Sequence, residues 1–168
     1  MYIRNNIKYR VTSNEMVPGN WFLSIRILNE AMAGIYGGVY HSPNTNYAEF
    51  LDYMERTWLP KIMDDNKQVV IIGDFNINWR NEANRRELKS IMDAIALKQI
   101  IEFETRSTLR SSFLIDLAFT NSEQMYAVDL ISEKLSDHES IGLAGGWSVD
   151  KKVPIKKTIV KNYSKRRF

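Results

Sequence analysis

The stretch that most constrains the fold runs from Val69 to Ile72 and on into Gly73, Asp74, Phe75 and Asn76. Four consecutive apolar β-branched residues predict a strand buried on both faces, and Gly73 predicts its end, where the backbone turns tightly or approaches another segment. In extended backbone Asp74 and Asn76 point the same way, while Phe75 faces the core. The strand is therefore expected to deliver a carboxylate and an amide to one sheet edge, as an active site requires. A strand followed by an Asx turn is the structural alternative.

Length and composition predict one domain. The 168 residues are 44% hydrophobic, which is enough to fill a core. No apolar run is long enough for a membrane helix, and no charged-then-apolar leader opens the chain, so we expect neither a membrane span nor a secretory signal. The absence of cysteine excludes disulfides and thiolate zinc sites. We therefore expect an intracellular protein, nuclear or cytoplasmic and not secreted.

The net charge of +3 hides an uneven distribution. Residues 151–168 contain eight Lys or Arg and no acid, whereas residues 1–150 contain 15 basic and 20 acidic residues. We predict a domain over 1–147 and a basic linker or tail over 148–168. Such a tail attracts phosphates whatever their sequence, although a solvated terminus is the commoner explanation.

Strands and helices alternate irregularly along the chain, which favours a mixed α/β layered fold. Two amphipathic helices are expected, the first ending before Pro60. Its apolar face holds Tyr47, Phe50, Leu51, Met54 and Trp58, and that of the second holds Leu88, Ile91, Met92 and Ile95. Strands are expected over 2–11, 21–27, 35–40, 68–72, 100–101, 113–119 and 126–131.

A histidine next to acids marks a second candidate site, in Ser136-Asp137-His138. The unperturbed pKa of histidine lies nearest neutrality, which suits proton transfer or charge stabilisation at a phosphate. Asp137 offers hard oxygens to Mg²⁺ or Mn²⁺. The structural alternative is a surface turn capped by Ser136 or Asp137.

Asp116 stands in an otherwise apolar stretch. Burying an unpaired carboxylate is costly, so Asp116 should have a partner. His138 is the most economical candidate, because an acid beside an imidazole orients the ring and raises its basicity. A structural ion pair with Arg106 or Arg110 is the alternative.

Tyr40 ends a predicted strand, just before His41 and a Pro-Asn turn. Its hydroxyl could donate a hydrogen bond to a phosphate oxygen. A tyrosine at a strand end is more often only a packed amphipathic side chain.

Together these motifs resemble the endonuclease/exonuclease/phosphatase superfamily. The resemblance rests, in order, on Val-Tyr-His-Ser-Pro-Asn at 39–44, Ile-Ile-Gly-Asp-Phe-Asn at 71–76, Thr105-Arg106, Leu-Ile-Asp-Leu at 114–117 and Ser-Asp-His at 136–138. The spacing is most similar to the endonuclease domain of LINE-like (non-LTR) retrotransposon polyproteins. The resemblance implies a four-layer α/β sandwich, in which two mostly antiparallel sheets pack together between helices. It also implies DNA as substrate, Mg²⁺ or Mn²⁺ as cofactor and a covalently following reverse transcriptase.

The resemblance also implies catalytic roles. Asp74 would activate or align the attacking water, and Asn76 would hold that water or the phosphate. His138, paired with Asp116, would stabilise charge on the transition state. Asp137 would belong to the metal site.

Three further residues are implied at the substrate. Tyr40 would bind the phosphate, with Thr105 and Ser136 as further phosphate- or substrate-binding candidates. In the family, an asparagine on the first strand and a later glutamate complete the metal site, and both precede the strand that residues 2–11 resemble. The chain is therefore expected to correspond to the carboxyl-terminal two-thirds of such a domain, without its first strands, which would expose sheet edges.

The leading hypothesis is a metal-dependent DNA endonuclease whose activity the missing ligands would impair. One alternative is another phosphoesterase of the superfamily, acting on a lipid, an inositol phosphate or RNA. The other is an inactive remnant that serves as a nucleic-acid-binding or interaction module.

Overall fold

The computed structural model of the chain describes residues 1–63, 67–108, 111–131 and 136–146. The predicted basic linker at 148–168 and Arg110 lie outside these ranges. None of the described helices has the length and apolar character needed to cross a membrane.

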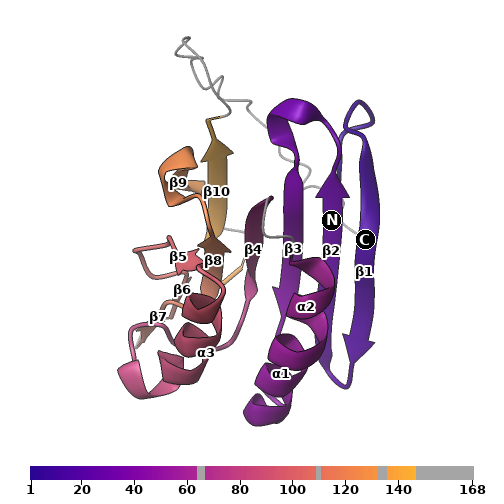
Figure 1. The fold of residues 1–168 in the computed structure, drawn as a ribbon. Helices are drawn as coiled ribbons and strands as arrows, with labels where there is room; N and C mark the ends of the chain where they lie inside the picture. The colour runs from indigo at the N-terminus through magenta and orange to yellow at the C-terminus, as the bar shows by residue number, and fades with distance from the viewer. Residues whose placement is uncertain (64–66, 109–110, 132–135, 147–168) are drawn as a thin grey trace, which may run out of the picture.

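The centre of the molecule is a six-stranded mixed sheet with the order β1-β2-β3-β4-β8-β5 (Figure 1). β3 and β4 are parallel, and the other neighbouring pairs are antiparallel. A parallel pair needs a crossover, which the helical segment between β3 and β4 supplies. The strands span Tyr9–Val17 (β1), Asn20–Ile27 (β2), Gly34–Tyr40 (β3), Gln68–Asp74 (β4), Asp116–Thr120 (β8) and Lys98–Gln99 (β5).

Helices cover one face of this sheet (Figure 1). They are Tyr47–Tyr53 (α1), the π-helical turn Met54–Trp58 (η2), Leu59–Ile62 (α2) and Glu82–Ala94 (α3). Phe22 of β2 packs against Phe50 and Trp58, with ring centroids 5.5 and 5.3 Å apart. The Trp58 indole donates to Ser13 Oγ at 2.7 Å, so the buried ring is also satisfied as a hydrogen-bond donor.

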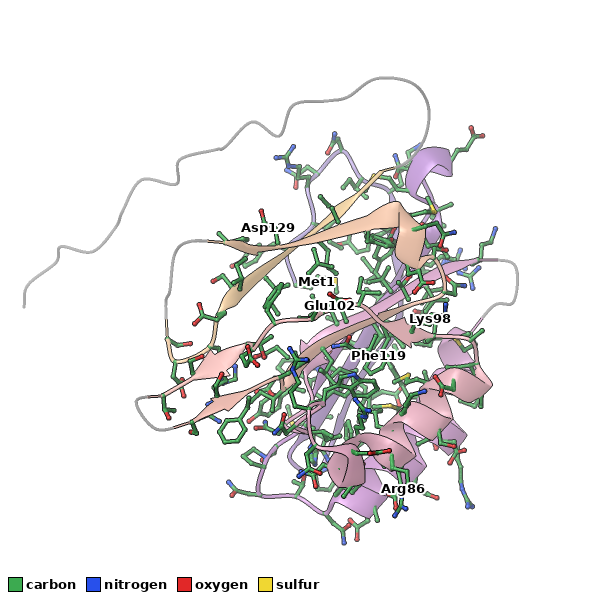
Figure 2. The ribbon with its side chains drawn as sticks, turned by 90° about the vertical axis from the view of Figure 1, so that its left-hand side faces the viewer. Met1, Arg86, Lys98, Glu102, Phe119 and Asp129 are labelled. Carbon is green, nitrogen blue, oxygen red and sulfur yellow. The ribbon has the colours of Figure 1, made fainter. Side chains whose placement is uncertain are left out.

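A two-stranded antiparallel sheet lies on the opposite face, made of Tyr126–Ile131 (β9) and Ser140–Gly145 (β10). Figure 2 shows Met1 between this pair and the large sheet, and Asp129 out on β9. Met1, Tyr36 and Leu143 help to line an apolar cavity of about 420 Å³ there. The remaining elements are the short hairpin Arg106–Ser107 (β6) with Ser112–Phe113 (β7), and the 3₁₀ turns Glu30–Met32 (η1) and Glu123–Met125 (η3).

The α/β class and the pairing of two sheets match the expectation from sequence. Within the described residues the second sheet has two strands and no α-helix lies over its outer side, so three of the four expected layers are seen. The end of the six-stranded sheet and the segment before β10 position the candidate site.

The central strand forms where the sequence predicts it. Val69, Val70 and Ile71 are buried, but the strand runs two residues further than predicted and ends at Asp74. A Cβ atom on Gly73 would lie 1.8 Å from the Val39 carbonyl oxygen. Gly73 is therefore needed for the close approach of β3, and the expectation that it ends the strand is wrong.

Other predicted boundaries also shift. The first strand begins at Tyr9 and not at Tyr2, because the chain turns at Asn5 and Asn6. Residues 1–8 lie against the face of the large sheet that the helices do not cover. The first helical segment continues through Pro60 to Ile62. The π-helical turn before it widens the backbone where a proline would otherwise clash, which explains the continuation.

Two further strands are displaced. The strand predicted at 100–101 lies at Lys98–Gln99. The strand predicted over 113–119 is broken, because the carbonyls of Leu114 and Ile115 accept from Trp79 N and Phe75 N, at 2.8 and 3.0 Å, instead of continuing the sheet.

Candidate active site

Two carboxylates meet at one end of the large sheet. Asp74 is the last residue of β4, Asp116 is the first residue of β8, and the two are directly paired in the antiparallel ladder. Paired residues point to the same face of a sheet, so the register itself brings the two side chains together. Tyr40, the last residue of β3, is paired with Asp74 on the other side. Three neighbouring strands thus present Tyr40, Asp74 and Asp116 in one row.

His138 reaches this row from the segment between β9 and β10. Its Nδ1 lies 2.9 Å from Asp116 Oδ2, and the two side chains are only 28% and 17% exposed. Because a carboxylate accepts, Nδ1 carries the hydrogen and donates. The predicted pairing of Asp116 with His138 is confirmed. Of the alternative partners, Arg106 pairs with Asp137 instead, and Arg110 lies outside the described residues.

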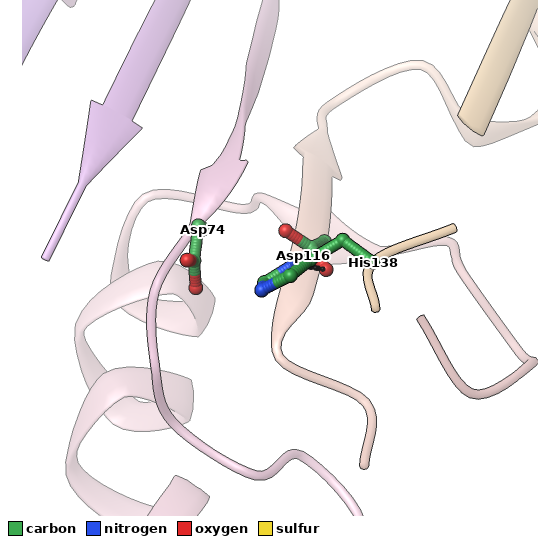
Figure 3. Close-up of side chains that lie close together, drawn as sticks. All are labelled: Asp74, Asp116 and His138. Carbon is green, nitrogen blue, oxygen red and sulfur yellow. Dashed lines mark hydrogen bonds and ion pairs between the residues drawn. The ribbon is translucent and has the colours of Figure 1, made fainter. Parts of the chain in front are cut away.

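Asp74, Asp116 and His138 form a compact cluster (Figure 3). One ligand atom from each residue lies within 4.8 Å of the others. All three side chains are partly exposed, so water can complete a coordination shell. Two carboxylates suit Mg²⁺ or Mn²⁺, and a cation would also offset the repulsion between the paired acids. The donor set therefore fits a divalent metal ion.

The environment of Asp74 makes its carboxylate a better base than a surface aspartate. Partial burial raises the pKa of Asp74, and the neighbouring charge of Asp116 raises it further. The hydrogen bond from the Asn76 backbone and the charges of His138 and Arg106 oppose this rise. Burial is the largest of these effects, so the net shift of the pKa is upward.

Asn76 does not point beside Asp74 as the extended-strand argument predicts. Its φ is +48°, a left-handed conformation that asparagine tolerates. Its backbone N–H donates to Asp74 Oδ1 at 3.0 Å, and its Nδ2 donates to the carbonyl of His41 at 2.7 Å. The Asx turn that was the structural alternative is thus present, and it is what orients the Asp74 carboxylate. Phe75 is fully buried, as predicted.

Asp137, the predicted metal ligand, is not part of the cluster. Its Oδ2 accepts from Arg106 Nε at 2.7 Å, and that bond lowers the pKa of the Asp137 carboxyl. The Ser136 hydroxyl accepts from the His138 backbone N–H at 3.0 Å, so it shapes the turn that carries the histidine. A metal-binding role for Asp137 and a substrate-binding role for Ser136 stay predictions.

Thr105 is fully buried, and the phosphate- or substrate-binding role suggested for it stays a prediction. Its Oγ1 accepts from the backbone N–H groups of Ile115 and Asp116, at 3.1 and 2.9 Å. Thr105 therefore fixes the start of β8 and with it Asp116. Tyr40, by contrast, is 44% exposed and accessible to a ligand.

Two residues outside the predicted site shape it. Arg106 forms an isolated antiparallel bridge with His138 and binds the Asp137 carboxylate, so it ties the 136–139 segment to the rest of the fold. His41 is buried and bonded to the Asp74–Asn76 segment. The sequence signal for His41 is its place directly after Tyr40, at the end of a strand beside β4. No local signal links Arg106 to Asp137.

The sequence profile of a protein family described as endonuclease-reverse transcriptase matches residues 36–142. These bounds include the cluster and its supporting residues. No curated protein sequence matches the chain.

Solved structures share the fold. The endonuclease domain of TRAS1, a telomere-specific non-LTR retrotransposon, aligns with a TM-score of 0.64 and 16% identity over 82% of this chain and 66% of that domain. TDP2 from D. rerio, complexed with a single-stranded DNA product, aligns with a TM-score of 0.53 and 17% identity over 79% of this chain and 66% of its own. Beta toxin from Staphylococcus aureus with bound magnesium ions aligns with a TM-score of 0.54 and 13% identity over 76% of this chain and 58% of its own.

These likenesses identify the fold of the endonuclease/exonuclease/phosphatase superfamily. The chain spans less than two-thirds of the length of each of these three structures.

Proposed function

Because this chain belongs to the endonuclease-reverse transcriptase family, we propose that it hydrolyses phosphodiester bonds in DNA with a divalent metal ion, as the endonuclease domain of a LINE-like retrotransposon. The observation that carries the proposal is the cluster of Asp74, Asp116 and His138 at the end of the sheet. The likeness to the TRAS1 endonuclease domain, to a magnesium-bound toxin and to a DNA-bound enzyme supports the metal and the substrate.

The metal ion, Mg²⁺ or Mn²⁺, would be held by the carboxylates of Asp74 and Asp116 together with water. Such an ion offsets phosphate charge and lowers the pKa of bound water. Asp137 would join this site only if its carboxylate left Arg106, with which it pairs at 2.7 Å.

Asp74 would accept the proton of the attacking water. Its Oδ1 already accepts from Asn76 N, so Oδ2 would be the oxygen available to the metal ion and to the water.

His138 would stabilise the charge that develops on phosphate oxygens. Its Nδ1 is committed to Asp116, so Nε2, in its protonated form, is the donor available to the substrate. Tyr40 stands in the same row of the sheet, where its exposed hydroxyl would hold a phosphate oxygen. Donors fixed in advance bind the transition state better than the ground state.

The test is nicking of supercoiled plasmid by the 168-residue chain with Mg²⁺ or Mn²⁺. We expect metal-dependent nicking that falls at least about a hundredfold in His138→Ala and in Asp74→Ala, the scale of losing an acid-base or charge-stabilising group. Asp129→Asn is the matched control, because it removes an exposed carboxylate from β9, away from the cluster.

The outcomes separate the alternatives. Turnover of small phosphate esters without plasmid nicking would indicate another phosphoesterase of the superfamily. Salt-sensitive DNA binding by the folded chain, without metal-dependent turnover, would overturn the enzymatic proposal in favour of a binding module.

A reverse transcriptase domain is the proposed covalent partner. The family description pairs an endonuclease with a reverse transcriptase, and residues 148–168 are strongly basic, as expected of a linker that stays close to nucleic acid. Sequencing the transcript beyond the codon for Phe168 tests whether such a domain follows.

A further inference from the structure

His41 is a buried histidine that the proposed chemistry does not use. It directly follows β3 and is only 4% exposed. Its ring stacks on Phe50, with centroids 4.3 Å apart and planes 26° apart, and tilts against Tyr47 at 6.3 Å. In packing terms it behaves as an aromatic core residue.

Hydrogen bonds tie His41 to three consecutive residues, beginning with Asp74 at the end of β4. Its backbone N–H donates to the Asp74 carbonyl at 2.9 Å. Its Nδ1 lies 2.7 Å from the Phe75 carbonyl oxygen, and its own carbonyl accepts from Asn76 Nδ2, also at 2.7 Å. One residue therefore fastens the whole Asp74–Asn76 segment.

The tautomer of His41 follows from these contacts. A carbonyl oxygen can only accept, so Nδ1 carries the hydrogen. Nε2 is then a buried acceptor, and it makes no hydrogen bond with any described residue. Burial lowers the pKa of His41, which keeps the ring neutral.

The orphaned Nε2 shows that packing alone does not explain a histidine here. A buried acceptor without a donor costs free energy, whereas a phenylalanine ring would fill the same space without that cost. The property that distinguishes histidine at this position is the Nδ1–H donor and its bond to Phe75.

That bond acts where the active-site geometry is set. The Asp74 carboxylate is oriented by the turn in which Asn76 adopts a positive φ and donates to Asp74 Oδ1. We propose that His41 is a positioning residue of the candidate active site, holding the Asp74–Asn76 turn so that the Asp74 carboxylate faces Asp116 and His138. The expected effect of His41 on the rate of DNA hydrolysis rests on the proposed function. Its expected effect on the conformation of the Asp74–Asn76 turn does not.

The first test uses the unmodified chain. The ¹⁵N shifts of the two histidine side chains report which ring nitrogen carries the hydrogen, and a His138→Ala sample assigns them. We expect neutral His41 with hydrogen on Nδ1. A neutral ring with hydrogen on Nε2 instead of Nδ1 would overturn the proposal.

The second test compares two amides at position 41. His41→Asn places a donor near the position of Nδ1, whereas His41→Gln places it further out, near Nε2. We expect His41→Gln and His41→Phe to lower kcat for nicking about ten- to a hundredfold, with KM within about twofold. The kcat of His41→Asn should stay much closer to that of the unmodified chain. The backbone and Nδ2 amide resonances of Asn76 should shift strongly in His41→Gln and His41→Phe and only slightly in His41→Asn, relative to the unmodified chain.

Phe50→Leu is the control for packing. It removes the ring on which His41 stacks but none of the hydrogen bonds, so Tm should fall while kcat stays near that of the unmodified chain. Equal losses in His41→Asn and His41→Gln, or unchanged Asn76 resonances in both, would contradict the positioning role. If the unmodified chain does not nick DNA, the proposed function fails, and the tautomer and the Asn76 resonances alone decide the inference.

Discussion

The two halves of the candidate site are held in different ways. Asp74 and Asp116 are paired residues at the ends of two neighbouring strands of the six-stranded sheet, and their positions follow from the register of β4 and β8. His138 lies in a short segment fastened by an isolated bridge to Arg106 and by a few backbone bonds, including Ser107 N to Asp137 O at 3.1 Å and Glu139 N to Thr105 O at 2.6 Å.

Effects on stability and effects on activity should therefore separate between these two regions. Damage to the β3–β4–β8 ladder disturbs the buried core and the carboxylates of Asp74 and Asp116 together. Damage to the 136–139 segment removes little buried surface, and the imidazole moves while the domain stays folded.

Gly73→Ala should be the most damaging single change. Its Cβ would lie 1.8 Å from the Val39 carbonyl oxygen, which is backbone and cannot rotate away, so β3 and β4 must separate. We expect a loss of about 3 kcal/mol or more in the free energy of unfolding, at the upper end of overpacking effects, measured by urea denaturation. Gly38→Ala is the control, because the nearest atom to its Cβ is the mobile end of Met1 at 4.0 Å. Equal effects at the two glycines would contradict the role of the ladder.

Thr105→Val should lower stability and turnover together. The change keeps the shape but leaves the N–H groups of Ile115 and Asp116 without their acceptor. We expect a loss of about 2 kcal/mol, the scale of buried unsatisfied donors, and a fall in kcat because Asp116 loses its support. Thr105→Ser keeps the hydroxyl and should retain most of both. Unchanged kcat in a destabilised Thr105→Val chain would show that Asp116 is held by its strand alone.

Asp74→Asn should abolish nicking yet stabilise the metal-free fold at neutral pH. The raised pKa means that the folded state holds the Asp74 charge at a cost, which is relieved as the pH falls through the folded pKa. With EDTA present, the variant should therefore melt at a higher temperature than the unmodified chain at pH 7. The difference should vanish below the unfolded pKa of aspartate, about 3.9. A variant that is less stable at pH 7 would show that the carboxylate is favourably placed without metal.

Arg106→Gln should have the smallest effect on stability. The pair with Asp137 is exposed, with side chains 38% and 46% accessible, and such pairs contribute less than about 1 kcal/mol. Because Arg106 also fastens the segment that carries His138, we expect kcat to fall several-fold while the urea midpoint hardly moves. A similar fall in stability and activity would remove the distinction between the two regions.

Local patterns were sufficient for part of the site. The apolar run at Val69–Ile72 predicts a buried strand whatever surrounds it, and Asp116 in an apolar stretch requires a partner that His138 supplies. The short-range motifs at 71–76 and 136–138 also point to the superfamily whose fold the structure shares. These conclusions rest on neighbouring residues and on the cost of burying charge.

The remaining details depend on contacts between distant segments. The positive φ of Asn76 and the diversion of Asp137 to Arg106 involve partners 35 and 31 residues away. Buried Thr105 accepts from residues 10 and 11 positions away. Residue types alone do not determine which of several compatible donors and acceptors meet.

By itself, the sequence determined that a buried strand leads into Asp74 and that Asp116 needs a partner, because hydrophobic periodicity and the cost of an unpaired charge are local properties. Only the tertiary structure decided which side chains face the cluster and which support it, since strand register and the close approach of β3 to β4 set those distances.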